Sequence, residues 1–505
     1  MQISTLLDRV IRLEPQSSAI EFNGEWRTWG DVSRIADAIN EILTSTGVPR
    51  EEGVGIMLRN RPAHMAAILA GMIDERCILT INPMQPHGRV LKDIRELRPR
   101  ALVADIEDWR SEDLRHLATE VGCVSIALER LETPQALPGL ARMGDIPLDA
   151  RFEGVAIQML TSGTTGAPKR VPLLKATWEK ALADAMVYDR DTHPDEPPRL
   201  RAGVVIVHNP FVHISGIFGV ALTVLAGRRT CLLEKFSVEA WQDAVKRHKP
   251  RVSALVPTAL RMMMDANIPQ QDLSSLVAIR SSTAPLPQEL ADQVYERYGI
   301  PVLGNYGATE FAGGVAGWSY RDWKKFGREK RGSVGRVHEG IEARVVHRDT
   351  HETLPTGDVG LLELRGGQLG DGSTWVRTTD LASLDEDRFL WIHGRADNAI
   401  IRGGFKVMPG DVSKALESHA DVREAAVVAI PDDRLGQVPV AVYTLEPGSA
   451  DPGESTLKGW VRQRMTAYSV PVRLRCVEEL PRTPSMKVSA VEVQALFSDE
   501  RGTCS

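Results

Sequence analysis

The first half of the sequence alternates short apolar segments typical of strands with segments typical of helices. Gly53–Leu58 and Ala101–Ala104 predict buried strands, and Pro62–Met72 predicts a helix between them. Such alternation favours an α/β fold, in which helices cover a mostly parallel sheet. Asn23-Gly24 lies between two short strand-like runs and predicts a β-hairpin near the N-terminus.

The pattern changes after Gly332. Arg344–Val346, Gly360–Leu364 and Phe389–Ile392 predict short strands separated by turns, so this part is expected to be mainly β. The last ~110 residues then run helix, strand, strand, helix, strand, helix, which is enough chain for a small α+β domain. We place a domain boundary near Arg395–Asp397 from this change in composition.

The composition is that of an ordinary globular protein. The chain has 505 residues, of which 43% are hydrophobic and 25% charged, and its length predicts about three domains or subdomains. Its 61 basic and 67 acidic residues give a net charge of −6, which argues against a dedicated nucleic-acid-binding protein. The five cysteines contain no CxxC pair, which indicates a reducing compartment and argues against a structural zinc site.

No segment predicts export or membrane insertion. The most apolar stretch, Phe211–Ala226, is shorter than the ~20 residues that a membrane span needs, and we expect it to form a buried helix. Met1–Arg9 lacks the apolar core of a secretion signal. We therefore expect a cytoplasmic protein with no integral membrane association.

The strongest local signal is the loop Thr161–Lys169 (TSGTTGAPK), which follows the strand-like segment Val155–Leu160. Its glycines let the backbone turn tightly and present N–H groups, while its hydroxyls and its lysine add further donors. An oxyanion-rich ligand such as a triphosphate requires such donors. The loop is not a Walker A sequence, because it lacks G-x-x-x-x-G-K-[ST]. On these residues alone, a flexible surface loop is an equal alternative.

A second motif is Gly304–Glu310 (GNYGATE). The ring of Tyr306 can stack on a base, and Thr309 with Glu310 offers the hard oxygen ligands that Mg²⁺ prefers. Taken alone, a turn with a buried tyrosine is the simpler interpretation.

Two further motifs lie closer to the C-terminus. Asp380 in RTTDL can accept hydrogen bonds from two ribose hydroxyls, and Arg395 in GRAD can contact sugar or phosphate oxygens. Lys487 ends the segment PRTPSMK. Taken alone, the first two suggest ordinary ion pairs on a β surface, and the lysine suggests a solvated side chain.

In this order and spacing, the four motifs resemble those of the adenylate-forming superfamily. That superfamily comprises acyl- and aryl-CoA ligases, the adenylation domains of peptide synthetases and firefly-type luciferases. The resemblance covers nearly the whole chain. It implies an α/β fold with a large N-terminal domain, residues 1–394, made of two α/β subdomains and a small β-barrel-like subdomain. A small mobile α+β lid, residues 395–505, would follow, with its hinge near Asp397.

The resemblance also implies a two-step ligase reaction. A carboxylic acid and ATP give an acyl-adenylate and pyrophosphate, and the thiol of coenzyme A then gives the acyl-CoA and AMP. The implied cofactors are ATP, Mg²⁺ and coenzyme A, and the implied partner is a small carboxylic acid, with no nucleic acid. Whether the protein is a homodimer is left open. The lid would rotate between the two steps.

The resemblance carries over to individual residues. It makes Lys169, Thr309, Glu310 and Lys487 catalytic, with Glu310 on the metal. The ATP- or AMP-binding residues would be Thr161, Ser162, Gly163, Thr164, Thr165, Gly166, Lys169, Ser282, Thr283, Ala284, Asn305, Tyr306, Gly307, Thr309, Asp380, Ile392, Arg395 and Lys487. The acid would meet His213, Gly216, Ile217, Thr283, Gly304 and Gly307. Coenzyme A would meet Gly403, Gly404, Phe405 and Lys406.

Several positions depart from the family pattern. Thr283, Thr379 and Met486 replace usual glycines, and Lys175 stands where many members have histidine. Arg365–Trp375 is shorter than the usual stretch. Benzoate-type aryl-CoA ligases show some of the same departures and a similar chain length. The departures therefore do not by themselves indicate an inactive enzyme, although Met486 puts the adenylation rate in question.

The presumed acid pocket favours an uncharged monocarboxylate. His213 cannot supply the fixed negative charge with which amino-acid-activating relatives pair a substrate ammonium group, and apolar residues such as Phe211 and Phe218 surround it in the sequence. Aryl and medium-chain acids both remain open, with aryl acids slightly favoured. The alternatives are an enzyme that loads a carrier protein, a non-catalytic nucleotide- or acyl-binding homologue and, more remotely, a luciferase-like oxygenase.

Overall fold

The computed structural model describes residues 2–129, 133–137, 139–140, 150–161, 169–188, 196–396, 399–402, 405–432, 434–483 and 486–497. These residues divide into two compact units. The first unit contains the described residues up to Glu342 together with Arg365–Val376, and the second contains Ala343–Leu364 and the described residues from Arg377 onward. Each unit is described by itself below.

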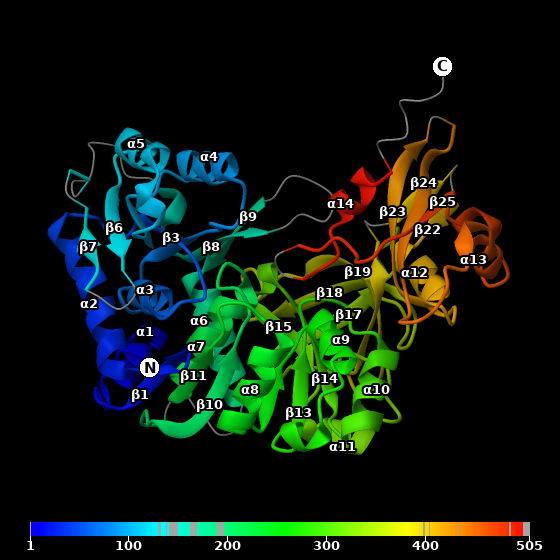
Figure 1. Cartoon of the computed structure of the whole chain (residues 1–505), viewed down its shortest axis with the longest axis horizontal. Coiled ribbons are helices and arrows are strands. Elements are labelled where there is room, and N and C mark those ends of the chain that lie inside the picture. Colours follow the sequence, from blue (N-terminus) through cyan, green and yellow to red (C-terminus); the bar gives the residue numbers. More distant parts are fainter. Residues whose placement is uncertain are drawn as a thin grey trace. The chain divides into compact units, whose positions relative to one another are not determined.

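The first sheet of the first unit is parallel at its centre and antiparallel at its two edges (Figure 1). Its strands, in spatial order, are β7 (Gln135–Ala136), β6 (Val124–Leu128), β5 (Ala101–Asp105), β3 (Gly53–Met57), β4 (Cys77–Ile81), β8 (Val155–Thr161) and β9 (Lys169–Leu174). Chain order and spatial order differ because β3 lies between β4 and β5, with both of which it pairs in parallel. Parallel neighbours require crossover connections, and helices supply them.

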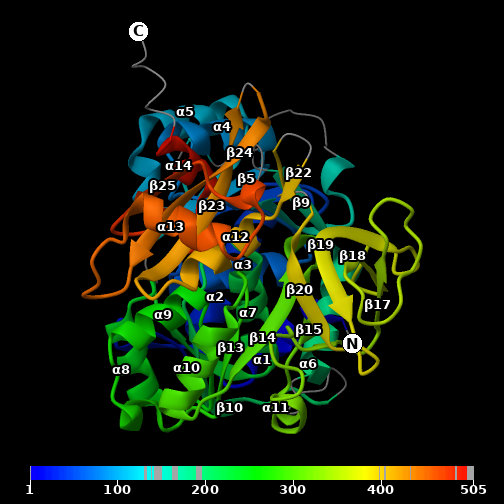
Figure 2. The same cartoon turned by 90° about the vertical axis from the view of Figure 1, so that its right-hand side faces the viewer.

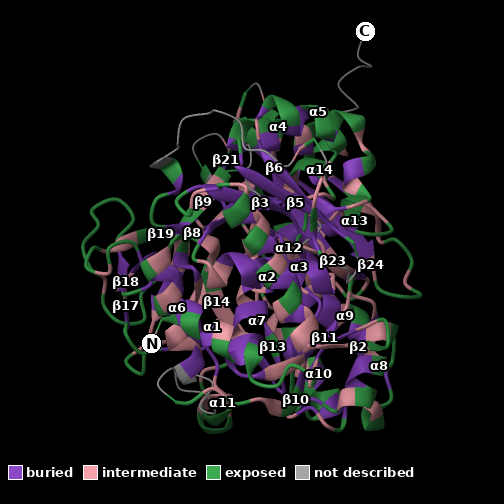
Figure 3. Ribbon diagram, turned by 90° about the vertical axis from the view of Figure 1, so that its left-hand side faces the viewer, coloured by how far each residue is buried: buried purple, intermediate pink, exposed green. Residues whose placement is uncertain are grey.

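Helices cover both faces of this sheet, so its central strands are buried throughout (Figure 3). Along β5, Ala101 and Val103 belong to one apolar cluster, and Leu102 and Ala104 belong to another. The first cluster includes α1 (Ile3–Arg12), α2 (Trp29–Ser45), α3 (Pro62–Ile73), α6 (Lys175–Tyr188) and α7 (Ile214–Leu225). The second includes α4 (His87–Leu97), η1 (Asp108–Arg110), α5 (Glu112–Glu120) and η2 (Ala150–Phe152). This doubly wound layer confirms the predicted α/β character.

The first unit contains a second α/β layer. One of its sheets has the order β10 (Arg201–Val207), β11 (Arg228–Leu232), β1 (Ser18–Phe22) and β2 (Glu25–Thr28). The other has the order β12 (Val252–Ala254), β13 (Ala278–Ser281), β14 (Val302–Ala308), β15 (Gly313–Gly317) and β16 (Arg336–Val337). The associated helices are α8 (Val238–His248), α9 (Pro257–Asp265), η3 (Gln270–Leu273), α10 (Gln288–Tyr298), η4 (Thr309–Phe311) and α11 (Tyr320–Phe326).

Two local predictions are confirmed in this layer. β1 and β2 form the expected hairpin, and its turn residues Asn23 and Gly24 have φ of 52° and 81°, as the tight turn of a hairpin requires. The apolar stretch from Phe211 folds mostly into α7, whose residues Ile217, Val220 and Val224 are fully buried. No helix among the described residues is long and apolar enough to cross a membrane.

The second unit contains two sheets (Figure 2). The first has the order β17 (Ile341–Val346, its first two residues in the first unit), β18 (Gly360–Gly366), β19 (Val376–Leu384) and β20 (Leu390–Arg395). The second has the order β22 (Phe405–Val407), β21 (Ile400–Arg402), β24 (Gly436–Leu445) and β23 (Val422–Asp432), and β25 (Arg473–Cys476) also pairs with β24. Its helices are α12 (Pro409–Glu417), α13 (Gly453–Arg462), η5 (Ala467–Ser469) and α14 (Ala490–Ala495).

The element order after Pro409 is the one predicted from the sequence, so the small α+β segment is confirmed. The compact second unit also takes in most of β17, β18 and β19, which precede residue 395. The predicted boundary between 1–394 and 395–505 concerns the movement of a lid and stays a prediction. Asp397, the predicted hinge, lies outside the described residues.

Candidate functional site

The carboxyl ends of β13 and β14 bring together two of the predicted segments. The two strands are parallel, and Ser281 at the end of β13 is the partner of Gly304 in β14. Ser282, Thr283 and Ala284 therefore continue from one strand end beside the chain that carries Asn305 to Glu310. In open α/β sheets, ligands bind at this edge. The half-buried side chains of Ser282, Thr283, Asn305 and Tyr306 are partly open to solvent there.

Glycines determine the shape of the antiparallel pair β14–β15. The register shifts between Tyr306 and Gly307, which produces a bulge next to the tyrosine. A Cβ atom on Gly307 would lie 2.2 Å from the carbonyl oxygen of Gly313, and one on Gly314 would lie 2.6 Å from Asn305 Oδ1. The two strands are thus closer than any side chain would permit, and this close packing fixes the backbone that carries Tyr306.

The hydroxyl and carboxylate pair lies just beyond this bulge. Thr309 and Glu310 belong to the short helix η4, where Thr309 is half-buried and Glu310 is exposed. The buried amide of Gln368 donates to the carbonyl oxygens of Phe311 (3.0 Å) and Gly314 (3.1 Å) and so ties η4 to β15. Mg²⁺ is commonly held by one or two carboxylates together with substrate phosphates. The exposed carboxylate of Glu310 fits that role.

The predicted phosphate loop connects two paired strands. β8 and β9 are antiparallel, and Thr161 and Lys169 are partners at the open end of the pair. The two ends of the loop are therefore held side by side, and Lys169 is exposed. The loop residues Ser162, Gly163, Thr164, Thr165 and Gly166 lie outside the described residues.

The predicted acid-binding residues lie at the start of α7. His213 is the N-cap residue, and its carbonyl oxygen accepts from the backbone N–H of Gly216 (3.0 Å). Gly216 must be small, because a Cβ atom there would lie 2.2 Å from the carbonyl oxygen of Pro210. Ile217 is fully buried in the core, whereas Phe218 is half-buried and meets the ring of Trp178 edge-on, with a centroid separation of 5.6 Å.

A residue that the sequence did not indicate holds this segment in place. Asn60 follows β3, and its side-chain amide donates to the carbonyl oxygens of Asn209 (3.1 Å) and Leu233 (3.3 Å). Its side-chain oxygen accepts from the N–H of Phe211 (2.9 Å). The side chain of Asn60 therefore anchors the chain that leads to His213.

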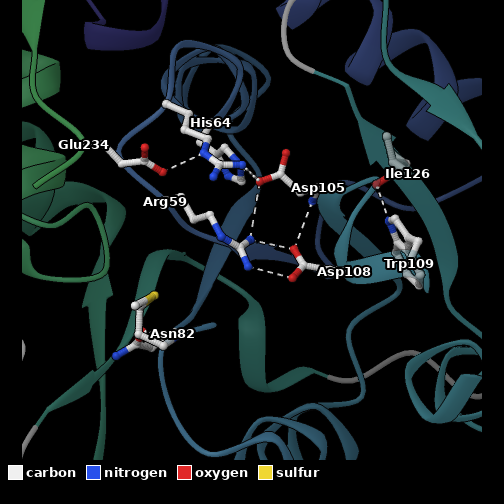
Figure 4. A network of polar contacts seen from close by, with 10 residues as sticks. Arg59, His64, Asn82, Asp105, Asp108, Trp109, Ile126 and Glu234 are labelled. Carbon is white, nitrogen blue, oxygen red and sulfur yellow. Dashed lines mark hydrogen bonds and ion pairs between the residues drawn. The ribbon is translucent and has the colours of Figure 1, made fainter. Parts of the chain in front are cut away.

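Charged residues on either side of Asn60 form a partly buried network at the carboxyl edge of the first sheet (Figure 4). Arg59 makes two bonds to the carboxylate of Asp108, at 2.6 and 2.7 Å. Asp105 accepts from Arg61 (2.8 Å) and lies 3.1 Å from the ring nitrogen Nε2 of the fully buried His64. Burial alone would raise the pKa of Asp105, but the hydrogen bond with His64 and the charges of Arg61 and Arg59 lower it overall. Because its charges are paired internally, we assign this network a structural role.

In the second unit, β19 and β20 bring Asp380 and Arg395 together as strand partners. A register shift between Leu381 and Ala382 produces a second bulge beside them. Arg395 Nη2 donates to Thr379 Oγ1 at 2.7 Å, and the N–H of Asp380 donates to Thr378 Oγ1 at 3.1 Å. Both side chains are half-buried, as is Ile392 in β20. Asp380 and Arg395, which were predicted from separate motifs, are thus adjacent in the sheet.

Lys487 lies at the base of a tight loop in the second unit. The N–H of Thr483 donates to the carbonyl oxygen of Lys487 (2.7 Å), and the N–H of Lys487 donates back to Thr483 Oγ1 (3.3 Å). Arg482 holds the loop against β23 through two hydrogen bonds to the carboxylate of Glu424, at 2.9 and 2.7 Å. The loop is therefore anchored, while the side chain of Lys487 is exposed.

Of the residues predicted to meet coenzyme A, Phe405 has a described side chain. It is 57% exposed, and one face of its ring stacks on Tyr468 with a centroid separation of 4.8 Å. Lys406 follows it in β22. Gly403 and Gly404 lie outside the described residues.

The backbone separates the three glycine replacements into two kinds. Thr283 and Met486 have φ of 80° and 62°, the left-handed region in which glycine is favoured. A β-branched residue such as threonine is a marked outlier there. Thr379 lies outside that region, and its hydroxyl accepts a hydrogen bond from Arg395. The first two replacements strain the chain, whereas the third adds a contact.

Sequence reasoning missed Asn60, Gln368, the Arg482–Glu424 pair and the role of Thr379. Their partners lie far away in the sequence or depend on strand register. The RN dipeptide that follows an apolar strand was the available signal for Asn60. No local sequence pattern marks Gln368 as an anchoring residue.

The sequence profile of AMP-binding enzymes matches residues 7–373, which is most of the chain. The chain belongs to the AMP-binding enzyme family. The profile of the C-terminal domain of AMP-binding enzymes matches residues 411–487.

This AMP-binding enzyme is similar over its whole length to characterised proteins. It is 29% identical to an indoleacetate–CoA ligase of Aromatoleum aromaticum, over 99% of this chain and 98% of that protein. It is 27% identical to 4-coumarate–CoA ligase 5 of Oryza sativa subsp. japonica, over 94% of this chain and 90% of that protein. Its fold matches that of ATP-bound MatB from Rhodopseudomonas palustris with a TM-score of 0.82, at 22% identity and 99% coverage of both chains. The predicted fold class is confirmed.

Proposed function

We propose that this AMP-binding enzyme is an ATP-dependent carboxylic acid–CoA ligase that acts through an acyl-adenylate. The observation that carries the proposal is the family match over residues 7–373. It is supported by the position of Tyr306, Thr309 and Glu310, which follow the paired ends of β13 and β14. In the first step, an oxygen of the acid attacks the α-phosphorus of ATP and pyrophosphate leaves. In the second, the thiol attacks the acyl carbon and AMP leaves.

The first step must bring two anions together, so charge neutralisation and positioning carry most of the catalysis. We assign this work to the Thr161–Lys169 loop for the β- and γ-phosphates and to Thr309 for the α-phosphate. Glu310 would hold Mg²⁺, which supplies positive charge to the phosphates. Tyr306 would lie against adenine, beside Ser282, Thr283 and Ala284. The bulge at Gly307 supports this assignment, because bulges commonly aim side chains into sites.

We propose further roles for residues of the second unit. Asp380 and Arg395 would bind the ribose, and their pairing across β19 and β20 supports a shared role. Lys487 would bridge the attacking carboxylate and the phosphoryl oxygen in the first step only. Phe405 and Lys406, with Gly403 and Gly404, would line the path of coenzyme A. Residues 395–505 would act as a lid hinged near Asp397.

We propose an aromatic monocarboxylic acid as the substrate. The named acids of the two curated relatives, indoleacetate and 4-coumarate, are both aryl acids. The half-buried Phe218, whose ring is fixed by Trp178, offers an aromatic surface next to the start of α7. The uncharged segment around His213 is consistent with an acid that has a single carboxylate.

Two further proposals concern the location and the oligomeric state of the protein. The free thiols of Cys77, Cys123, Cys231 and Cys476 suit a reducing compartment, so we propose a cytoplasmic location. A homodimer is a further proposal, which sedimentation or light scattering at several concentrations tests directly.

The deciding experiment measures AMP release from ATP with a panel of acids, each with and without coenzyme A. The panel contains indole-acetate, cinnamates, benzoates, C4–C12 fatty acids, dicarboxylates and amino acids. We expect aryl acids to give CoA-dependent turnover. Pyrophosphate release limited to about one equivalent despite coenzyme A would indicate a carrier-protein acceptor. Nucleotide binding without AMP release for any acid would favour a non-catalytic homologue.

Lys487→Ala separates the two steps. Removal of one preorganised charge from a reacting oxyanion typically costs about 10²- to 10³-fold in rate. We expect that loss in acid-dependent pyrophosphate release, while thioester formation from a supplied aryl-adenylate is retained. Lys92→Ala, at an exposed lysine of α4, is the matched control. Equal loss of both steps would contradict the assigned role.

A further inference from the structure

Three side chains with metal-binding chemistry converge where β1 and β11 pack against α8. Glu21 and Cys231 are partners in the parallel pair β1–β11, so their side chains lie next to each other on one face of the sheet. His248, the last residue of α8, reaches the same point. One ligand atom from each of the three lies within 4.8 Å of the other two. Ligand atoms bound to one tetrahedral zinc ion are about 3.5 Å apart. The facing atoms of Glu21 and His248 are in direct contact and would have to separate to admit the ion.

The three side chains are buried, unlike the acidic clusters common on protein surfaces. Glu21 and Cys231 are each 2% exposed, and the side chain of His248 is 10% exposed. Glu21 Oε1 is bound by the guanidinium of Arg247. Glu21 Oε2 is in direct ion-pair contact with the ring nitrogen Nε2 of His248. When the imidazole is neutral, this oxygen and the ring nitrogen can each offer a lone pair to a cation.

We propose that Glu21, Cys231 and His248 form a binding site for Zn²⁺. Sulfur and imidazole ligands select a borderline ion such as Zn²⁺ over Mg²⁺. One thiolate, one carboxylate and one neutral imidazole around Zn²⁺ carry no net charge, and the guanidinium of Arg247, which contacts Glu21 and His248, adds one positive charge beside them. Binding releases one proton, from the thiol of Cys231, to solvent. Three protein ligands leave a fourth position for water.

Neighbouring groups already hold the ligands in the required orientation. Arg247, which binds Glu21 Oε1, is itself held by Asp243 at 2.7 Å. The ring of Trp26 meets that of His248 edge-on, with a centroid separation of 5.8 Å. Partners that orient ligands in this way are a regular part of metal sites. The ion would join the N-terminal hairpin to β11 and α8.

The test measures zinc directly and needs no ligase activity. The full-length protein is stripped with a chelator, loaded with Zn²⁺ or Co²⁺ and passed over a desalting column. We expect one equivalent of Zn²⁺ to be retained, and the Co²⁺ form to show a near-ultraviolet thiolate charge-transfer band. Cys231→Ser should abolish that band and weaken Zn²⁺ binding by more than the ~100-fold that loss of a supporting partner can cost.

Two further variants make the result decisive. Cys123→Ser, at another buried cysteine of the first unit, is the matched control and should leave the stoichiometry and the band unchanged. If Cys231→Ser does not fold, His248→Gln, at the least buried ligand, should give the same loss of Zn²⁺ binding. No retained zinc in the wild-type protein would overturn the proposal, as would unchanged binding by the folded ligand variants. The cluster would then be an ion-pair network alone.

Discussion

Two bulged antiparallel strand pairs carry candidate site residues, and they are held together in opposite ways. In β14–β15 of the first unit, glycines bring the strands so close that no side chain fits at Gly307. In β19–β20 of the second unit, side chains make the contact, because the hydroxyl of Thr379 accepts a hydrogen bond from Arg395. The first pair should therefore be sensitive to added atoms and the second to removed ones. Substitutions in each pair test this difference.

The largest effect is expected from Gly307→Ala. The new Cβ would lie 2.2 Å from a backbone oxygen, so the strands must separate, and such overpacking costs about 1–3 kcal/mol or more. Chemical denaturation should show that loss, and ATP–pyrophosphate exchange should fall with it. Gly88→Ala in α4 is the control, since nothing lies within 4 Å of its Cβ position. Equal stability of the two variants would remove the packing argument.

An effect of similar size concerns acid stability behind the same strand pair. The backbone N–H of His338 donates to Val315 in β15 at 2.9 Å, and burial lowers the pKa of His338 to about 4 from 6.5. The unfolded chain binds this proton at higher pH than the folded chain does. Stability is therefore complete above pH 6.5 and is lost progressively as the pH falls towards 4, by about 3 kcal/mol in all.

Denaturation curves between pH 7.5 and 4 measure this loss. His338→Gln should reduce the dependence of stability on pH by the amount that His338 contributes. His87→Gln, at an exposed histidine of α4, should leave the profile unchanged. An unaltered slope in His338→Gln would show that the buried ring does not contribute.

A smaller effect of opposite sign is expected from Thr283→Gly at the end of β13. Its φ of 80° is strained for a β-branched residue, and relief of that strain should stabilise the protein by about 1 kcal/mol after the entropy cost of glycine. Thr283→Ala keeps most of the strain and should not be stabilised. Thermal denaturation compares the three proteins. Destabilisation by glycine would show that the threonine side chain makes a compensating contact.

The smallest effect is expected from Thr379→Gly, which removes the acceptor of Arg395. An exposed hydrogen bond of this kind is worth about 0.5–1.5 kcal/mol, so the KM for ATP should rise about threefold at unchanged kcat. Thr379→Ser keeps the hydroxyl and should restore the wild-type value. Glycine would thus raise the stability of the protein at position 283 and weaken ATP binding at position 379. The same sign at both positions would contradict the distinction between the strained replacement at Thr283 and the contact-making replacement at Thr379.

Much of the fold follows from local sequence. β3, α3 and β5 appear where apolar runs of strand or helix length predict them, and the Asn23-Gly24 turn forms because both residues tolerate positive φ. The element order after Pro409 was likewise predictable. These features depend on interactions between residues near each other in the chain, which a single sequence displays.

The candidate site was predictable only as a set of separate motifs. The sequence names Asp380 and Arg395, but strand register makes them neighbours. It shows a threonine and a methionine where the family resemblance leads one to expect glycine, but only the backbone angles reveal that Met486 is strained and Thr379 is not. Backbone angles at such positions depend on contacts from other elements, which no local pattern encodes.

By itself, the sequence determined the α/β class, the order of the elements and the identity of the motif residues, because periodicity and turn chemistry act over short stretches of chain. Tertiary structure alone decided that Asn60 holds the segment before His213, that Gln368 ties η4 to β15, and that Glu21, Cys231 and His248 meet. These groups are distant in the chain. They come together because strand register and helix packing minimise exposed apolar surface over a whole unit.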